Sequence, residues 1–333
     1  MDTVATRQRT ALPTAALDLL AVGELFLDVL YGPLPSAPAL GQEIFTDRVD
    51  LVPGGIANFA LAAAALDARA GVSAHTGTGP AADLAATILT ARGVDTSGLI
   101  AAPDHDLQIT TALAYDGERA LVTGGTAPRE QIQPDLDTLP ARAIAVHIGL
   151  ADMPWLERAQ SAGSQIFADV GWDPTEQWDR AVLRHLSHCH GFVPNAVEAM
   201  AYTRTDTPLQ AARELATIVP LTVVTCGGSG VIGIDAAAGT EITLPAQDLG
   251  PVDPTGAGDT FGAALITLLG RGLDLRDALE AAALAATGRA AAVHGPGRTP
   301  TLPQLATLAR TQGLVCAEPL SALAQAPSPS TSD

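Results

Sequence analysis

The sequence predicts a single α/β domain in three layers, with helices on both faces of a mostly parallel central sheet and a small β-sheet lid. Short β-type apolar runs alternate with Ala- and Leu-rich helical patterns along most of the chain, which is typical of such a sheet. Two stretches, about residues 31–52 and 108–123, break the alternation because they resemble strands with no helix between them and their neighbours. We therefore expect these stretches to form the lid.

Each element is predicted from its own pattern, strands from short apolar runs and helices from longer Ala- and Leu-rich segments. In chain order we expect a strand at 19–29, a helix at 56–67, a strand at 71–76, a helix at 81–92, strands at 144–148, 165–170, 190–193 and 221–225, and helices at 260–269 and 275–292. The last two helices are apolar on nearly every face, so they should be buried.

The two ends of the chain differ in composition from the part between them. Residues 1–15 and 318–333 are polar or small and rich in Pro and Ser, so we expect a flexible N-terminal tail and a disordered C-terminal tail. A single domain should span residues 16–317. Its lid would suit chemistry from which water must be excluded.

Composition and charge exclude several classes of function. The 333 residues carry a formal net charge of −18 and no lysine. Nucleic-acid binding is not expected, because no basic surface is available to replace counterions. Three widely spaced cysteines form neither a disulfide framework nor a metal motif, which indicates a reducing compartment. No apolar stretch of membrane-spanning length lacks charges or helix breakers, so we expect a cytoplasmic protein without a membrane partner.

The strongest motif is Asp-Pro-Thr-Gly-Ala-Gly-Asp-Thr-Phe at residues 253–261, which leads into an apolar helix. The first N–H groups of a helix lack intrahelical acceptors, and the helix dipole adds positive potential there. The amides of Gly256, Ala257 and Gly258 can therefore bind an anion, while the Asp259 carboxylate can accept a proton. An anion hole beside a base suits phosphoryl transfer. Composition alone is equally compatible with an Asp-capped helix after a glycine-rich turn.

This segment resembles the C-terminal signature of the ribokinase-like (pfkB) carbohydrate kinase family, D-T-x-G-A-G-D-x-F, from which it departs only at Pro254. The family also has an N-terminal signature of two glycines closely followed by an asparagine, which Gly54, Gly55 and Asn58 match. Two distant signatures in this order are specific, and the resemblance extends over roughly residues 19–303. It implies the ribokinase-like fold and a kinase that uses ATP and Mg²⁺.

The resemblance also implies roles on the acceptor side of the site. Asp259 would be the catalytic base, which takes the proton of the acceptor hydroxyl while the γ-phosphate is transferred in line. Hydroxyl groups of the substrate would be bound by Asp28, Gly54, Gly55 and Asn58. Asp28 follows the first predicted strand, and ligands of open α/β sheets bind at the carboxyl ends of the strands.

For the nucleotide, the resemblance assigns Asn195, Thr225, Gly227 and Gly230 to ATP binding, and Glu198 to Mg²⁺ through water. Residues 225–230 are similar to the family's T-x-G-x-x-G loop. Asn195 and Glu198 also fit a capping box, which stabilises the start of a helix without any ligand. Both interpretations stay open.

Two further residues match a cation site. Asp253 and Thr255 match positions that help to bind an activating monovalent cation, usually K⁺, in many relatives. Pro254 alters the backbone between them, so K⁺ binding is kept as a hypothesis.

The acceptor is the least determined part of the prediction. Relatives phosphorylate sugars, sugar derivatives or nucleosides, so we expect a small sugar or sugar-like substrate. A nucleoside (adenosine-type) kinase and a non-catalytic sugar- or nucleotide-binding regulator are the alternatives. The D-x-N-x-R motif that fructokinase-like members usually carry is not matched at 169–173. A homodimer formed through the lid is a further hypothesis.

Overall fold

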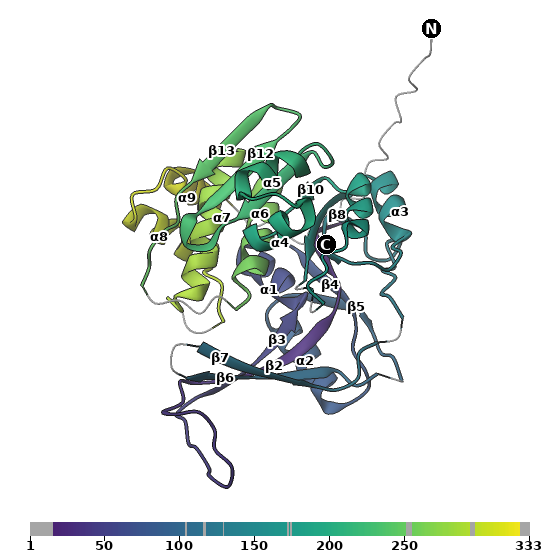
Figure 1. Ribbon diagram of the computed structural model, residues 1–333, viewed down its shortest axis with the longest axis vertical. Helices are drawn as coiled ribbons and strands as arrows, with labels where there is room; N and C mark the ends of the chain where they lie inside the picture. The colour runs from purple at the N-terminus through teal and green to yellow at the C-terminus, as the bar shows by residue number, and fades with distance from the viewer. Residues whose placement is uncertain are drawn as a thin grey trace.

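Two β-sheets organise the computed structural model (Figure 1), which describes residues 16–326 except 104, 116–117, 129, 172, 174, 251–254, 294–296 and the side chains of 118–119. The larger sheet has nine strands in the order β13-β12-β11-β10-β9-β8-β1-β4-β5. The run from β11 to β5 is parallel, and β12 and β13 extend it in antiparallel pairings. Its strands are β1 Leu17–Val22, β4 Ala70–His75, β5 Asp95–Ile100, β8 Ala141–Ile148, β9 Gln165–Val170, β10 Gly191–Phe192, β11 Leu221–Thr225, β12 Val231–Asp235 and β13 Thr240–Leu244.

Helices cover both faces of the larger sheet, each face with its own hydrophobic core. The first core is formed with α1 Ala57–Ala65, α2 Pro80–Ala91, α6 Ala257–Gly270, α7 Leu275–Ala290, α8 Leu302–Thr311 and α9 Ala317–Gln325. The second core is formed with α3 Trp155–Ala162, η1 Arg180–His188, α4 Ala196–Thr203 and α5 Pro208–Leu215. The predicted three-layer α/β architecture is therefore confirmed.

The second sheet is the predicted lid. It has four strands in the order β3-β2-β6-β7 and lies below the main body in Figure 1. Its strands are β2 Leu25–Tyr31, β3 Val49–Gly55, β6 Gln108–Tyr115 and β7 Glu118–Gly124. Residues 32–48 form no strand, although the prediction placed them within the lid segment; they make a long loop between β2 and β3.

The predicted strand at 19–29 is in fact two strands. It is divided at Gly23 and Glu24, where β1 of the larger sheet ends and β2 of the lid begins. A Cβ atom on Gly23 would lie 3.2 Å from the Ile56 Cβ, so a small residue suits this close passage. The apolar run conceals the division because both halves are strands.

The prediction of a disordered tail from residue 318 is wrong for its first part. Residues 317–325 form α9, and Leu320 is fully buried in the first core. The apolar positions of this short helix outweigh its small residues, since Leu320 and Leu323 both pack against that core. The Pro- and Ser-rich end at 327–333 and the predicted tail at 1–15 lie outside the described residues.

Candidate functional site

The start of α6 lies at the centre of the site. Gly256 has a φ of 65°, the left-handed conformation that favours glycine, and the helix begins at the next residue. Asp259 stands in the first turn of this helix. The N–H groups that α6 leaves without intrahelical acceptors therefore surround the same point as the Asp259 carboxylate.

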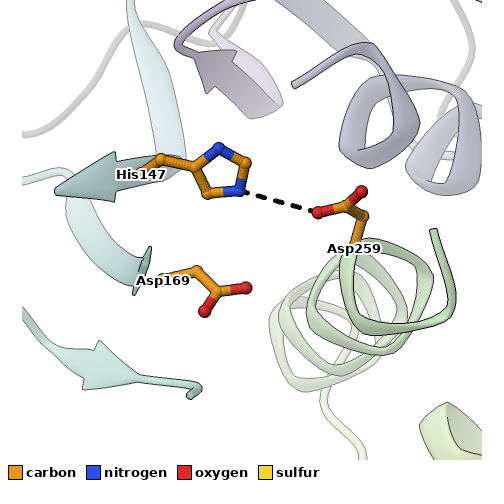
Figure 2. A group of neighbouring side chains, drawn as sticks. All are labelled: His147, Asp169 and Asp259. Atoms are coloured by element: carbon orange, nitrogen blue, oxygen red, sulfur yellow. Dashed lines mark ion pairs between the residues drawn. The ribbon is translucent and has the colours of Figure 1, made fainter. Parts of the chain in front are cut away.

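Three segments from distant parts of the sequence approach Asp259. Asn58 of α1 donates a hydrogen bond from Nδ2 to Asp259 Oδ2 over 2.9 Å. His147 Nε2 forms an ion pair of 3.6 Å with Asp259 Oδ1. Asp169 completes the group in Figure 2, where one potential ligand atom from each of His147, Asp169 and Asp259 lies within 4.8 Å of the others. His147 and Asp169 are partners in the parallel pairing of β8 and β9, which explains why they lie side by side.

Burial and mutual charge shift the pKa values of this group. Burial lowers the pKa of His147, but the hydrogen bond and charge of Asp259 outweigh it, and with the charges of Asp169 and Glu24 they raise that pKa to about 9. Burial raises the pKa of Asp169 to about 8, although His147 opposes the shift. The imidazolium of His147 thus lies close to both acidic side chains, and its ion pair with Asp259 balances the charge of that carboxylate.

Three cavities adjoin one another at this site, and Asp259 lines the central one. The central cavity, about 230 Å³, is lined by Asp259, Gly256, Gly258, His147, Asp169, Asn195, Glu198 and Thr225 among others. A second cavity of about 350 Å³ shares Thr225 and Gly258 with it. A third of about 380 Å³ shares His147 and Gly171. We call these the central, nucleotide-side and acceptor-side cavities after the functions proposed below.

Backbone and small side chains form the nucleotide-side cavity. Thr225 ends β11, and Gly227 and Gly230 follow with φ values of 52° and 99°. A Cβ atom on Gly230 would collide with the Leu244 carbonyl oxygen, so only glycine fits there. The opposite wall is mainly alanine, with Ala283, Ala286 and Ala290 of α7.

The capping box predicted at residues 195–198 is present. Asn195 Oδ1 accepts from the Glu198 N–H at 3.0 Å, and Glu198 Oε2 accepts from the Asn195 N–H at 2.9 Å. Both residues also line the central cavity. The two interpretations of the sequence are therefore compatible, because the cap aims these polar groups at the cavity.

The predicted substrate-binding residues gather beside Asp259. A Cβ atom on Gly54 would collide with the Asp28 carboxylate, and one on Gly55, whose φ is 60°, would collide with the Glu24 carbonyl oxygen. Burial raises the pKa of Asp28 to about 6, against the charge of Arg289. The lid and α1 thus bring Asp28, the two glycines and Asn58 to one edge of the site.

A buried arginine lies behind this edge. Arg289 of α7 is only 6 % exposed. Its Nη2 donates to Asn58 Oδ1 at 3.0 Å, its Nη1 to the Gly297 carbonyl at 2.7 Å and its Nε to the Thr255 carbonyl at 3.3 Å. The Thr255 backbone is thus bound by an arginine at the position where sequence reasoning expected K⁺. Asp253, the other residue of that hypothesis, lies outside the described residues.

Sequence reasoning missed His147, Asp169 and Arg289. The first two had a usable signal, since each is a polar residue near the carboxyl end of a predicted parallel strand, where ligands bind. Arg289 had none, because an arginine in an Ala-rich helix has the pattern of an exposed residue.

The residues of the central cavity suit a divalent cation with a phosphate chain. Glu198 and Asp169 offer carboxylate oxygens and Asn195 an amide, which are the ligand types and hydrogen-bonding groups that Mg²⁺ with its waters uses. The amides at the start of α6 offer N–H groups to an anion.

Comparisons with known proteins identify a family and a fold. The family described as pfkB family carbohydrate kinase matches residues 35–302. The bifunctional protein HldE of Halorhodospira halophila (strain DSM 244 / SL1) is 31 % identical over 269 residues, which are 76 % of this chain and 54 % of HldE. The chain thus spans about half the length of this relative.

Solved structures share the fold at lower identity. A proposed ribokinase from Agrobacterium tumefaciens has a TM-score of 0.78 and 21 % identity, covering 90 % of this chain and 99 % of that one. Arabidopsis thaliana ribokinase, solved with ribose and ATP, has a TM-score of 0.72 and 21 % identity, covering 88 % and 98 %. Adenosine kinase from Sinorhizobium meliloti has a TM-score of 0.72 and 19 % identity, covering 90 % and 100 %.

Among the described residues, no helix is long and apolar enough to cross a membrane.

The family match covers most of the chain, and the glycine-rich turn and Asp259 lie within it. The chain is therefore a member of the pfkB family of carbohydrate kinases.

Proposed function

We propose that this kinase transfers the γ-phosphate of ATP, bound with Mg²⁺, to a hydroxyl of a small sugar or sugar-like molecule. The observation that carries the proposal is a central cavity, lined by Asp259, that shares residues with two neighbouring cavities. The central cavity shares Thr225 and Gly258 with one neighbour and His147 and Gly171 with the other. A donor and an acceptor bound in the outer cavities would therefore react in the central one, beside a carboxylate and a helix N-terminus.

In this mechanism Asp259 is the base. One of its carboxylate oxygens takes the proton of the acceptor hydroxyl, whose oxygen forms a bond to the γ-phosphorus. The bond from that phosphorus to the β,γ-bridging oxygen breaks, and ADP leaves with its electron pair. Asn58 donates to one Asp259 oxygen and His147 pairs with the other, so both partners orient the carboxylate.

The other predicted residues would bind the donor. The amides of Gly256, Ala257 and Gly258 stabilise the charge on the transferring phosphoryl group. Asn195 and Glu198 would reach Mg²⁺ and phosphate through water. When bound, Mg²⁺ would neutralise part of the phosphate charge. Thr225, Gly227 and Gly230 form the wall of the nucleotide-side cavity. Since the chain has no lysine, helix N–H groups and the cation must do what a phosphate-loop lysine does elsewhere.

The acceptor-side cavity favours a hydroxyl-rich molecule. Its described lining includes His75, His105, Gln108, Glu130 and Gln131, which together offer donors and acceptors to a polyol. Ribose bound to the Arabidopsis relative supports a sugar, and the adenosine kinase relative keeps a nucleoside as the second candidate.

The test is ADP release by the purified chain with Mg-ATP and a panel of neutral sugars, sugar phosphates, ketodeoxy acids and nucleosides. We expect turnover with at least one neutral sugar or sugar-like acceptor. Turnover with nucleosides alone would replace the sugar by a nucleoside. Binding of ATP without turnover on any acceptor would contradict the kinase and favour a regulator.

We also propose that two copies associate through the lid. Apolar side chains are exposed on its outer strands, where Val49, Leu51, Leu121 and Val122 are between 44 % and 63 % exposed. Burial of such residues against a second copy removes apolar surface from water. Sedimentation velocity should therefore give a dimer, and the double substitution of Leu121 and Val122 by Ser should give a monomer. A monomeric native chain at micromolar concentration would contradict the dimer.

A further inference from the structure

A fixed positive charge is buried behind the catalytic turn. Arg289 lies on α7, far along the chain from Asn58, yet its guanidinium donates to Asn58 and to two backbone carbonyls. A charge this deeply buried is unfavourable unless it is paired and hydrogen-bonded. Its two backbone acceptors are Thr255, just before the anion-binding turn, and Gly297, in the loop after α7. The arginine therefore joins two segments that flank the site.

The guanidinium dictates the orientation of Asn58. Because a guanidinium has donors only, Asn58 must present its amide oxygen to Arg289. Its NH₂ group then faces Asp259, to which it donates at 2.9 Å. The reversed amide would place an oxygen against the Asp259 carboxylate, which is unfavourable. Arg289 therefore acts on the base through Asn58 without touching it.

The guanidinium also supports the anion-binding turn. Its Nε donates to the carbonyl of Thr255, directly before Gly256. A Cβ atom on Gly256 would lie 2.6 Å from Arg289 Nη2, so the planar group packs against the glycine itself. Only glycine combines this close approach with the φ of 65° found there. The turn and the arginine thus fit together as one unit.

A bound monovalent cation would make contacts of the same kind. K⁺ is bound by oxygen atoms, chiefly backbone carbonyls, as in the filters of K⁺ channels. Here the carbonyl oxygens of Thr255 and Gly297 both accept from Arg289, at 3.3 and 2.7 Å. The residues present therefore do not fit K⁺ at the Thr255 carbonyl, because a cation of the chain already binds there.

We propose that the Arg289 guanidinium is a built-in replacement for an activating monovalent cation, so that phosphoryl transfer by this chain does not depend on K⁺. The inference rests on the proposed kinase function. Arg289 is a positioning residue: it holds the Gly256 turn in shape and keeps the Asn58 amide directed at Asp259.

The first test measures the cation dependence of the native chain. ADP release is measured with saturating Mg-ATP and acceptor in chloride salts of K⁺, Na⁺ and tetramethylammonium at one ionic strength. We expect kcat to agree within about twofold among the three, since the internal cation is present in each. A tenfold or larger stimulation by K⁺ would overturn the proposal.

The second test removes the internal cation. Arg289→Ala should lower kcat by about 10²-fold, because small misplacements of catalytic groups have effects of that size, while KM for ATP changes little. Adding guanidinium or K⁺ at millimolar concentration should restore much of the loss. An unchanged kcat, or a loss in a folded variant that no cation restores, would contradict the proposal.

Matched variants separate positioning from folding. Arg271 also donates to two carbonyls, those of Leu66 and Leu323, at the other end of α6. Arg271→Ala should lower thermal stability without changing kcat or creating a cation response. Arg289→Lys keeps the positive charge but has fewer directed donors, so its kcat should be higher than that of Arg289→Ala. If the alanine variant does not fold, the lysine variant takes its place in the test.

A structural readout distinguishes this inference from the kinase function. Crystals of the native chain soaked in Tl⁺, a heavy analogue of K⁺, should show no anomalous peak within bonding distance of the Thr255 and Gly297 carbonyls. Crystals of Arg289→Ala should show one. A Tl⁺ peak at these carbonyls in the native chain would overturn the proposal that Arg289 replaces the cation, even if an acceptor were found. If the peaks are as expected but no acceptor is phosphorylated, only the kinase function is contradicted.

Discussion

The nucleotide-side and acceptor-side cavities both adjoin the central cavity of Asp259 but are built differently. The nucleotide side is rich in glycine and alanine, with Gly227, Gly230 and the alanines of α7, and its described lining has no ionisable side chain. The acceptor side carries ionisable side chains among apolar ones, including His75, His105, His147 and Glu130. The phosphates of ATP, a substrate that many enzymes share, can be bound by the shape of a cavity and by backbone N–H groups. Selection of one particular acceptor requires particular side chains.

Asp259 lines the central cavity, where the two reactants would meet, so its loss should have the largest effect. Asp259→Asn removes the base but keeps the size of the side chain, and kcat should fall roughly 10²–10⁴-fold, the usual contribution of a general base. ATP binding, measured by calorimetry, should change little. The matched control is Asp277→Asn, which removes a carboxylate from the first turn of α7. Near-normal turnover of Asp259→Asn would refute the role of the base.

The predicted acceptor-binding residues are tested at Gly54. In Gly54→Ala the new Cβ collides with the Asp28 carboxylate, which must turn away from its present position. We expect kcat/KM for the acceptor to fall by about 10²-fold, in line with a misplaced binding group, with KM for ATP retained. Gly79→Ala is the control, because a Cβ there meets no atom within 4 Å. Equal effects on both substrates would mean that the two sides are not separate.

The nucleotide side alone is tested at Ala286, which lines its cavity. Ala286→Leu places three more carbon atoms in the space proposed for the nucleotide. Overpacking of this kind costs about 1–3 kcal/mol, so KM for ATP should rise about tenfold while KM for the acceptor stays constant. Ala236→Leu, at an exposed turn after β12, should leave both constants unchanged. A rise in KM for the acceptor alone would reverse our assignment of the cavities.

The smallest expected effect is on the pH dependence of stability, and it concerns the charged pair of His147 and Asp259. The folded-state pKa of His147 is about 9, against an ordinary value of 6.5. The charged pair with Asp259 therefore stabilises the fold fully below about pH 6.5, and this stabilisation is lost as the pH rises through 9. Melting temperatures between pH 7 and 10 should fall less steeply for His147→Gln than for the native chain. His188→Gln should keep the native slope; a native slope in His147→Gln would contradict the pairing.

How much could be predicted from the sequence depends on whether a feature is determined by neighbouring or by distant residues. The glycine turn, Asp259, Gly54, Gly55 and Asn58 can be predicted as site residues because each belongs to a short motif with a local backbone requirement. The layers and the lid were found because alternating strand and helix patterns are local as well. Both kinds of signal depend on neighbours within a few residues.

The missed features depend on contacts between distant segments. His147 and Asp169 meet because β8 and β9 pair in one register, and no local pattern determines that register. Arg289 is buried because it finds partners in α1 and in two loops. The start of the C-terminal tail was misplaced for a similar reason, since the burial of Leu320 depends on the core beneath α9.

The division of the first strand has a consequence for the timing of the reaction. The chain passes between the large sheet and the lid at Gly23–Glu24 and again at Gly55–Ile56, and the Ile56 N–H donates to the Glu24 carbonyl at 2.9 Å. Asn58, which donates to Asp259, follows two residues later. A movement of the lid would therefore reach Asn58, the partner of the base, through one hydrogen bond and two residues of chain. An acceptor that moved the lid on binding would then align the base only when it is present, and ATP bound alone would not be hydrolysed.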